Sequence, residues 1–179
     1  LQPADMVVID PRGRLLAGTR KPSSEYRLHL AVYEERPDVA AIVHAHPPIA
    51  NGFTFAGQAI EACVVPEVVA TLGSIPTTEY ATPSTQEGAD VIRRYIREHD
   101  AVMLQRHGSV TVGPTLLDAY HKLEKLEHTA QVLLVARQLG HVQPLAPDEV
   151  ARLAGLRETL GIGPGESVYR ACGMQPPAK

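Results

Sequence analysis

The fold is indicated most clearly by the stretch AAIVHAHPP, residues 40–48. Its first four residues form an apolar run typical of a buried strand, and two prolines follow, which are tolerated in the first turn of a helix. A strand that passes directly into a helix is characteristic of α/β proteins. Because alternate side chains leave a strand on one face, the imidazoles of His44 and His46 are expected to point to the same side.

His44 and His46 are therefore candidate metal ligands. Their positions lie about 6.6 Å apart along an extended backbone, a spacing that lets two rings converge on one ion. A catalytic zinc typically has three protein ligands and one open position, so a third ligand and a base are needed nearby. Alternating histidines also occur on solvated sheet faces, and the pair alone leaves both interpretations open.

Composition limits the class of protein. The chain has 179 residues, 44% of them hydrophobic, and this suffices for one domain with a sizeable core. A net charge of −3 offers no basic field for nucleic acid, so we expect no nucleic-acid partner. No apolar stretch reaches about 18 residues and no signal peptide is evident, which predicts no membrane partner and a cytoplasmic location. The opening LQPAD reads like the middle of a domain, so we expect an N-terminal part to be absent.

The two cysteines, Cys63 and Cys172, have no C-x-x-C spacing. This pattern suggests neither a disulfide framework nor a thiolate metal site, and we expect two reduced thiols.

Hydrophobic periodicity predicts one domain over residues 1–161, followed by a proline- and glycine-broken tail over 162–179. Met6–Ile9 and Leu15–Leu16 are expected to form a hairpin. Ser23 or Ser24 is a natural N-cap for the first helix. Helices are expected over residues 23–36, 47–55, 85–99, 116–139 and 147–160, and buried strands over 38–46, 101–105 and 109–112.

His107 is the third candidate ligand because, like His44, it closes a buried strand at a chain reversal, and strand ends line the ligand crevice of open α/β sheets. An ordinary turn histidine is the alternative. The other five histidines are expected to be structural or solvated; they are His29, His99, His121, His128 and His141.

The segment Pro22-Ser23-Ser24-Glu25 places polar groups at a helix start. Glu25 can bring a carboxylate to the same crevice, although a first-turn glutamate that complements the helix dipole would explain it locally. Ser23 and Ser24 can act as caps, and hydroxyls with free backbone N–H groups at a helix start also form a seat for phosphate or carboxylate.

Four motifs together resemble a known family. They are Pro-Ser-Ser-Glu at 22–25, His-x-His-Pro at 44–47, Ile-Pro with Tyr-Ala-Thr-Pro at 75–83, and Gln-x-His-Gly at 105–108. In this order and spacing, from Leu1 to about Gly161, the chain resembles the class II, zinc-dependent aldolase and adducin-like family. The resemblance implies a single three-layer αβα domain with a central, mainly antiparallel sheet.

The resemblance also implies roles for the candidate residues. His44, His46 and His107 would ligate one Zn²⁺ per subunit, a site that other divalent transition metals can also occupy. Glu25 would be the catalytic acid/base, and Ser23 and Ser24 would bind the substrate phosphate.

The implied reaction is reversible retro-aldol cleavage of a phosphorylated ketose, such as fuculose 1-phosphate, to dihydroxyacetone phosphate and an aldehyde. A small phosphorylated sugar is then the expected partner, and the family implies a homotetramer with active sites at subunit interfaces. Glu25, where related ribulose-phosphate 4-epimerases have aspartate, favours an aldolase over an epimerase.

Two departures leave the proton donor to the aldehyde oxygen unnamed. The family's tyrosines align here with Val65 and near Leu160. Tyr80 or Tyr169 can substitute, although a packed or surface tyrosine is the alternative for each. Glu67, a charge within an apolar run, is a second candidate carboxylate, with a strand-end ion pair as its alternative.

These departures keep other functions open. One is another family reaction on a sugar phosphate: dehydration of methylthioribulose 1-phosphate, decarboxylation of a sugar-acid phosphate, or 4-epimerisation. Another is a non-catalytic, adducin-like binding module, which predicts missing metal ligands.

Overall fold

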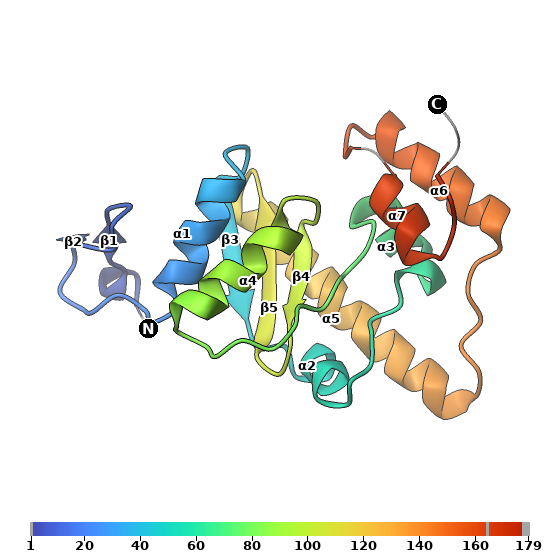
Figure 1. The fold of residues 1–179 in the computed structure, drawn as a ribbon, viewed down its shortest axis with the longest axis horizontal. Helices are drawn as coiled ribbons and strands as arrows, with labels where there is room; N and C mark the ends of the chain where they lie inside the picture. The colour runs from blue at the N-terminus through green and yellow to red at the C-terminus, as the bar shows by residue number, and fades with distance from the viewer. Residues whose placement is uncertain (1, 164, 177–179) are drawn as a thin grey trace.

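The computed structural model describes residues 2–163 and 165–176. At its centre is a three-stranded antiparallel sheet in the order β3-β5-β4, formed by Ala41–Ala45, Gly108–Gly113 and Ala101–Leu104 (Figure 1). All residues of β4 and β5 are buried, as expected of strands covered on both faces. The expected strands and the turn between β4 and β5 are confirmed.

Helices cover both faces of this sheet (Figure 1). On one face, α1 (Tyr26–Glu35) and α4 (Gln86–Ile96) pack over Val102 and Leu104. On the other face, α2 (Pro48–Phe55), α3 (Pro66–Thr71) and α5 (Leu116–Leu139) pack over Ala101 and Met103. Successive residues of β4 thus serve opposite layers, as the two-residue period of a strand requires. The predicted three-layer αβα fold is confirmed.

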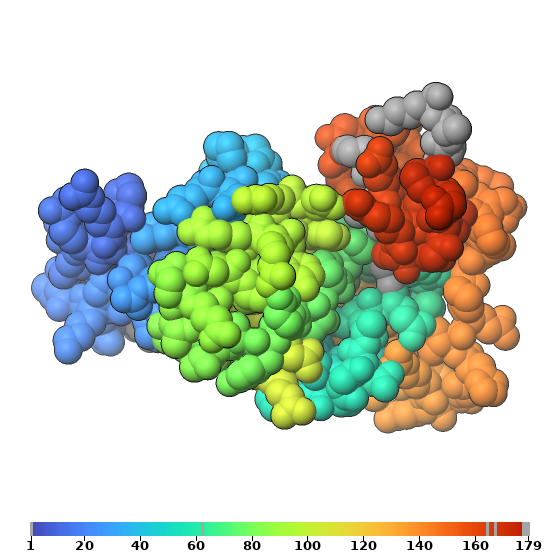
Figure 2. Space-filling model, viewed as in Figure 1, coloured from blue at the N-terminus to red at the C-terminus, as the bar shows by residue number. Residues whose placement is uncertain are grey.

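An N-terminal hairpin lies beside α1. A short 3₁₀ helix, η1 (Pro3–Asp5), precedes β1 (Val8–Ile9), which pairs antiparallel with β2 (Leu15–Ala17), as predicted. In the space-filling view this hairpin protrudes at one end of the molecule, the C-terminal helices lie at the other, and α4 covers the near face of the sheet (Figure 2).

The C-terminal part contains more structure than expected. After α6 (Pro147–Thr159), the segment expected to be a tail forms α7 (Glu166–Ala171). Val168 of α7 joins Val69, Val150 and Ala154 in a separate hydrophobic cluster. Gly165 is the N-cap of this six-residue helix, and Gly173, with a φ of 66°, follows its C-cap.

A disulfide joins Cys63 to Cys172 across 109 positions of the chain, so the expectation of two reduced thiols was wrong. Cys63 lies in the 3₁₀ helix η2 (Ala62–Val64) and Cys172 is the C-cap of α7. Packing of α7 against η2 brings the two together. The spacing of cysteines along a sequence carries no signal for a pair formed by such remote packing.

Two local expectations need correction. The apolar run around Glu67 is helical and not a strand, because Pro66 begins α3 and places Glu67 in its first turn; the carboxylate there interacts electrostatically with Lys125. At α1 the N-cap is Glu25, with no capping bond from its side chain, and not Ser23 or Ser24. Ser23 Oγ instead accepts a hydrogen bond from Glu25 N at 3.2 Å.

No helix among the described residues is both long and apolar enough to cross a membrane.

Candidate functional site

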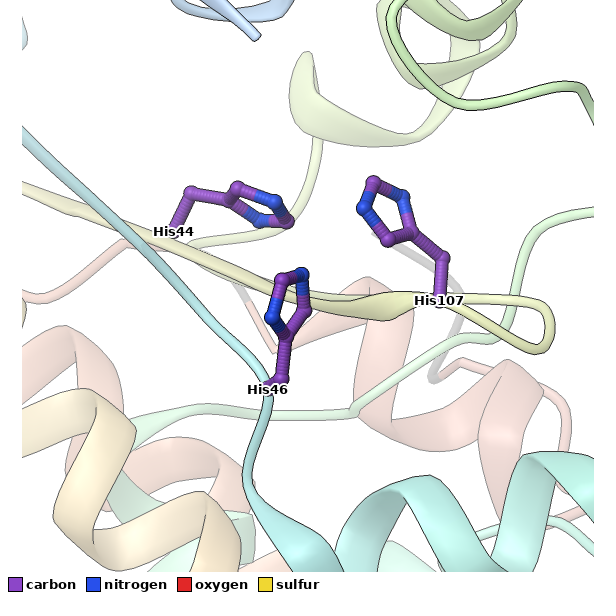
Figure 3. A group of neighbouring side chains, drawn as sticks. All are labelled: His44, His46 and His107. Atoms are coloured by element: carbon purple, nitrogen blue, oxygen red, sulfur yellow. The ribbon is translucent and has the colours of Figure 1, made fainter. Parts of the chain in front are cut away.

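The structure brings the three predicted histidines together. His44 lies on β3, His46 follows it just beyond the strand, and His107 lies in the turn between β4 and β5. Their rings point toward one another (Figure 3), and one ligating nitrogen from each lies within 4.8 Å of the others. This arrangement fits a single metal ion bound by three imidazoles.

The tautomer of His44 is fixed for metal binding. Its Nδ1 lies 2.9 Å from the carbonyl oxygen of Ser109 on the neighbouring strand β5. Because a carbonyl only accepts, Nδ1 carries the proton and Nε2 keeps a lone pair. That Nε2 is buried and has no hydrogen-bond partner. This nitrogen is therefore available to bind a metal ion.

Burial lowers the pKa of two of these imidazoles. Loss of solvent lowers the pKa of His44 below its usual 6.5, and the neighbouring His46 lowers it further, although the Ser109 bond and Glu25 oppose both. The pKa of His107 is also lowered, first by burial and then by His44. Only neutral imidazole binds a metal, so both shifts favour ligation.

Gly108 provides room for the cluster. A Cβ at this position would lie 2.5 Å from the carbonyl oxygen of Ala45 and 2.6 Å from Cδ2 of His46. Any side chain here would push β3 and its histidines away from β5.

Helix α2 holds the turn that carries His107. Asn51 Nδ2 donates to the His107 carbonyl at 2.9 Å, and the hydroxyl of Thr54 accepts from Arg106 N at 3.1 Å. Glu127 of α5 in turn caps α2 by accepting from the N–H groups of Ile49 and Ala50. Sequence reasoning missed these supporting residues because each acts across 50 or more positions of the chain.

Glu25 faces the histidine cluster, as expected. Its Oε2 lies 3.9 Å from His44 Nε2 and 3.8 Å from His107 Nε2, and its side chain is 15% exposed. The layered packing of the fold explains why Glu25 and His44 lie close together. Ile42 of β3 packs with α1 and α4, so His44, two residues on, faces the same side, where α1 begins. Glu25 Oε1 accepts a short hydrogen bond from the hydroxyl of Ser84.

The two predicted phosphate-binding serines lie at the same edge. Ser23 and Ser24 are exposed residues immediately before Glu25. Ser24 Oγ lies 2.9 Å from Ser84 Oγ, which itself contacts Glu25. A ligand seated on these hydroxyls would therefore lie close to the carboxylate.

A pocket of about 1050 Å³ opens beside His46, and Val65 and Glu67 line it. His121 and His128, expected to be structural or solvated, are exposed on α5 and also line the pocket. Glu67 is thus a carboxylate in the same hollow as one metal-ligand candidate.

The two candidate tyrosines differ in their surroundings. Tyr80 is 57% exposed, in the loop before α4. Tyr169 of α7 packs against the C-terminal cluster. Within the described part of the chain, neither tyrosine makes a hydrogen bond or ring contact with the three histidines.

Comparison with known proteins agrees with this geometry. Residues 1–134 match the model of the class II aldolase and adducin N-terminal domain family. A 5-deoxy-D-ribulose 1-phosphate aldolase of Bacillus thuringiensis serovar kurstaki is 32% identical over 161 residues, covering 89% of this chain and 75% of the relative. An L-fuculose phosphate aldolase of Methanococcus vannielii is 34% identical, covering 74% and 70%.

A solved structure is also similar. An L-fuculose 1-phosphate aldolase superposes with a TM-score of 0.80 at 28% identity, covering 90% of this chain and 74% of that one. The family match spans most of the chain, and the histidine cluster lies within the matched residues. The chain belongs to the class II aldolase and adducin family and is an enzyme of the aldolase type.

Proposed function

We propose that this protein cleaves a ketose 1-phosphate reversibly to dihydroxyacetone phosphate and an aldehyde, with a zinc ion at His44, His46 and His107. The observation that carries the proposal is the placement of Glu25 Oε2 within 4 Å of two of these histidines. A carboxylate beside a metal ion supplies the two groups that such a cleavage can use, an acid/base for the carbon fragment and a positive charge for its developing negative charge.

The proposed cleavage conserves atoms and protons. The C3–C4 bond of the ketose breaks, the C4 hydroxyl gives its proton to solvent, and C4 leaves as the aldehyde. C3 of the remaining fragment takes up a proton and becomes part of dihydroxyacetone phosphate. Zinc, when bound, supplies the positive charge that stabilises the negative charge developing on that fragment.

We propose that Glu25 transfers the proton to and from C3. In cleavage Glu25, protonated from solvent, delivers a proton to C3 from its Oε2, and in synthesis the ionised carboxylate removes that proton. Other divalent metals, such as manganese, cobalt or iron, fit three nitrogen ligands as well, because geometry and supply decide among them.

Ser23 and Ser24 form the proposed phosphate seat. Both are exposed at the start of α1, where hydroxyls and the positive end of the helix dipole attract an anion. A phosphate anchored there would hold the three-carbon fragment near Glu25. Relatives whose names specify L-fuculose phosphate or 5-deoxyribulose 1-phosphate suggest the range of ketoses to test.

The proposal includes a homotetramer with active sites at subunit boundaries. Tyr120 and Val132 of α5 are exposed and line the pocket beside His46, so a second copy would cover apolar surface next to the site. Sedimentation velocity of the purified protein measures this assembly.

A cytoplasmic location also remains a prediction. Cytosolic reductants keep most thiols reduced, so alkylation of Cys63 and Cys172 in intact cells, followed by mass spectrometry, would test the compartment together with the disulfide.

A product assay tests the proposed reaction. Zinc-loaded protein is given L-fuculose 1-phosphate, 5-deoxyribulose 1-phosphate and 5-methylthioribulose 1-phosphate, and dihydroxyacetone phosphate and aldehyde are quantified. We expect both products in equal amounts from at least one ketose. Consumption of a ketose without any aldehyde would contradict the proposal.

Glu67 favours one alternative. Its carboxylate lies in the pocket beside His46, where the expected tyrosine is replaced by Val65. A second carboxylate suits dehydration, which removes a proton and protonates a leaving hydroxyl. In the same assay, dehydration of 5-methylthioribulose 1-phosphate would give a product two hydrogens and one oxygen lighter and no aldehyde.

A further inference from the structure

Ser84 adopts an unusual backbone conformation. Its φ is 64°, in the left-handed region that residues with side chains rarely occupy. Within the described part of the chain, Arg106 is the other non-glycine residue with a positive φ, and it lies next to His107. Ser84 lies in the loop before α4, between Pro83 and the N-cap Thr85. Such strained backbone is found preferentially at functional sites, so the Ser84 side chain is a candidate for a role at the edge of this site.

The hydroxyl of Ser84 supports such a role. It contacts both Oε1 of Glu25 and, at 2.9 Å, Oγ of Ser24. A hydroxyl has one proton and a carboxylate only accepts, so Ser84 donates to Glu25 and Ser24 donates to Ser84. The three side chains thus form one directed chain of hydrogen bonds that ends on Glu25.

The two helices that carry these groups are fixed to each other. Glu25 lies at the start of α1 and Ser84 just before α4, and these helices pack side by side. Arg93 of α4 bridges them through ion pairs with Glu34 and Glu35 of α1. The Ser84 hydroxyl is therefore held at a set place relative to the Glu25 carboxylate.

We propose that Ser84 is a positioning residue that holds Oε1 of Glu25 so that Oε2 faces the metal site. The two carboxylate oxygens then have separate tasks, since Oε1 is occupied by Ser84 and Oε2 lies within 4 Å of His44 and His107. This inference rests on the proposed role of Glu25 in proton transfer.

The test compares Ser84→Gly and Ser84→Ala with the wild type. Glycine removes the hydroxyl and relieves the left-handed backbone, whereas alanine removes the hydroxyl alone. We expect kcat to fall by about tenfold to a hundredfold in both variants, because misplaced catalytic groups cause losses of this size. KM should change less than kcat, since Ser84 contacts the base directly and meets the proposed phosphate seat only through Ser24. Zinc content should be unchanged, and the Tm of Ser84→Gly should equal or exceed that of the wild type.

Thr85→Ala is the matched control in the same loop. The Thr85 side chain caps α4 by accepting from Gly88 N, so its loss should lower Tm while kcat is retained. If the loop had only a structural role, kcat would fall in the variants whose Tm falls. The proposal instead predicts that kcat falls in the Ser84 variants and Tm falls in Thr85→Ala.

Three results would overturn the assignment: wild-type kcat in Ser84→Gly, a rise in KM that accounts for the whole loss of kcat/KM, or loss of bound zinc. A wild-type enzyme that cleaves none of the three ketose phosphates would instead contradict the proposed function itself, so the two failures are distinguishable.

Discussion

The end of the sheet that carries the three histidines and the C-terminal helices α6 and α7 are held together differently. At the histidine end, strand ends and helix starts converge, and contacts such as His44 Nδ1 with the Ser109 carbonyl order each side chain. At the C-terminal end, a small apolar cluster and the Cys63–Cys172 disulfide fasten α7. We therefore expect the chemistry to depend on the histidine end. The C-terminal end should contribute to the free energy of unfolding independently of the chemistry.

The largest effect is expected from removing a metal ligand. His107→Ala should lose stoichiometric zinc and turnover, because the two remaining imidazoles bind the ion less tightly than three. Metal analysis by mass spectrometry and the product assay measure both. His141→Ala is the matched control, since this exposed histidine follows α5 and should leave both quantities unchanged. Full zinc occupancy in His107→Ala would contradict the site.

Glu25→Gln separates catalysis from metal binding within the histidine end. The amide keeps the size of the side chain and cannot transfer a proton, so turnover should fall about 10²–10⁴-fold while zinc remains bound. Glu67→Gln, in the neighbouring pocket, is the comparison variant. If Glu67→Gln abolished turnover and Glu25→Gln did not, the assignment of the base would be wrong.

Opening the disulfide tests the C-terminal end alone. Cys63→Ser with Cys172→Ser should lower the free energy of unfolding by about 2–5 kcal/mol, because the cross-link no longer restricts the unfolded chain. Urea unfolding measures the loss. Zinc content and kcat should stay at wild-type values, since the disulfide is absent from the contacts that order the three histidines. A parallel loss of zinc would show that the two regions depend on each other.

The smallest expected effect is the pH dependence of the metal-free protein. Burial lowers the pKa of His29, His44 and His107 below 6.5, so as pH falls the unfolded chain takes up protons first. The contribution of these neutral imidazoles to the free energy of unfolding should therefore be fully present above about pH 7. It should decrease as pH falls through 6.5. Urea titrations from pH 7.5 to 5.5 measure this slope, which the double serine variant should share. An unchanged free energy across that range would contradict neutral buried imidazoles.

Much of the histidine end was predictable because its rules are local. The apolar run before His44 specifies a buried strand, the prolines after His46 specify the start of α2, and the chain reversal at His107 follows from two adjacent strands. These patterns gave the strands and α5 at nearly the observed residues.

The remainder depends on contacts between distant segments. The disulfide joins residues 109 positions apart, and Asn51 supports His107 across 56 positions. Ser84 was also missed, because its contact with Glu25 follows from the packing of α1 against α4. Tyr80 and Tyr169 were named as candidates from their residue type. Residue type alone could not place either side chain relative to the metal site.

X-ray absorption at the zinc edge of the purified, zinc-loaded protein tests the central claim most directly. The account predicts three nitrogen neighbours at about 2.0–2.1 Å, with oxygen completing the coordination. Sulfur neighbours at about 2.3 Å, or a shell of oxygen atoms only, would contradict a metal centre built from His44, His46 and His107.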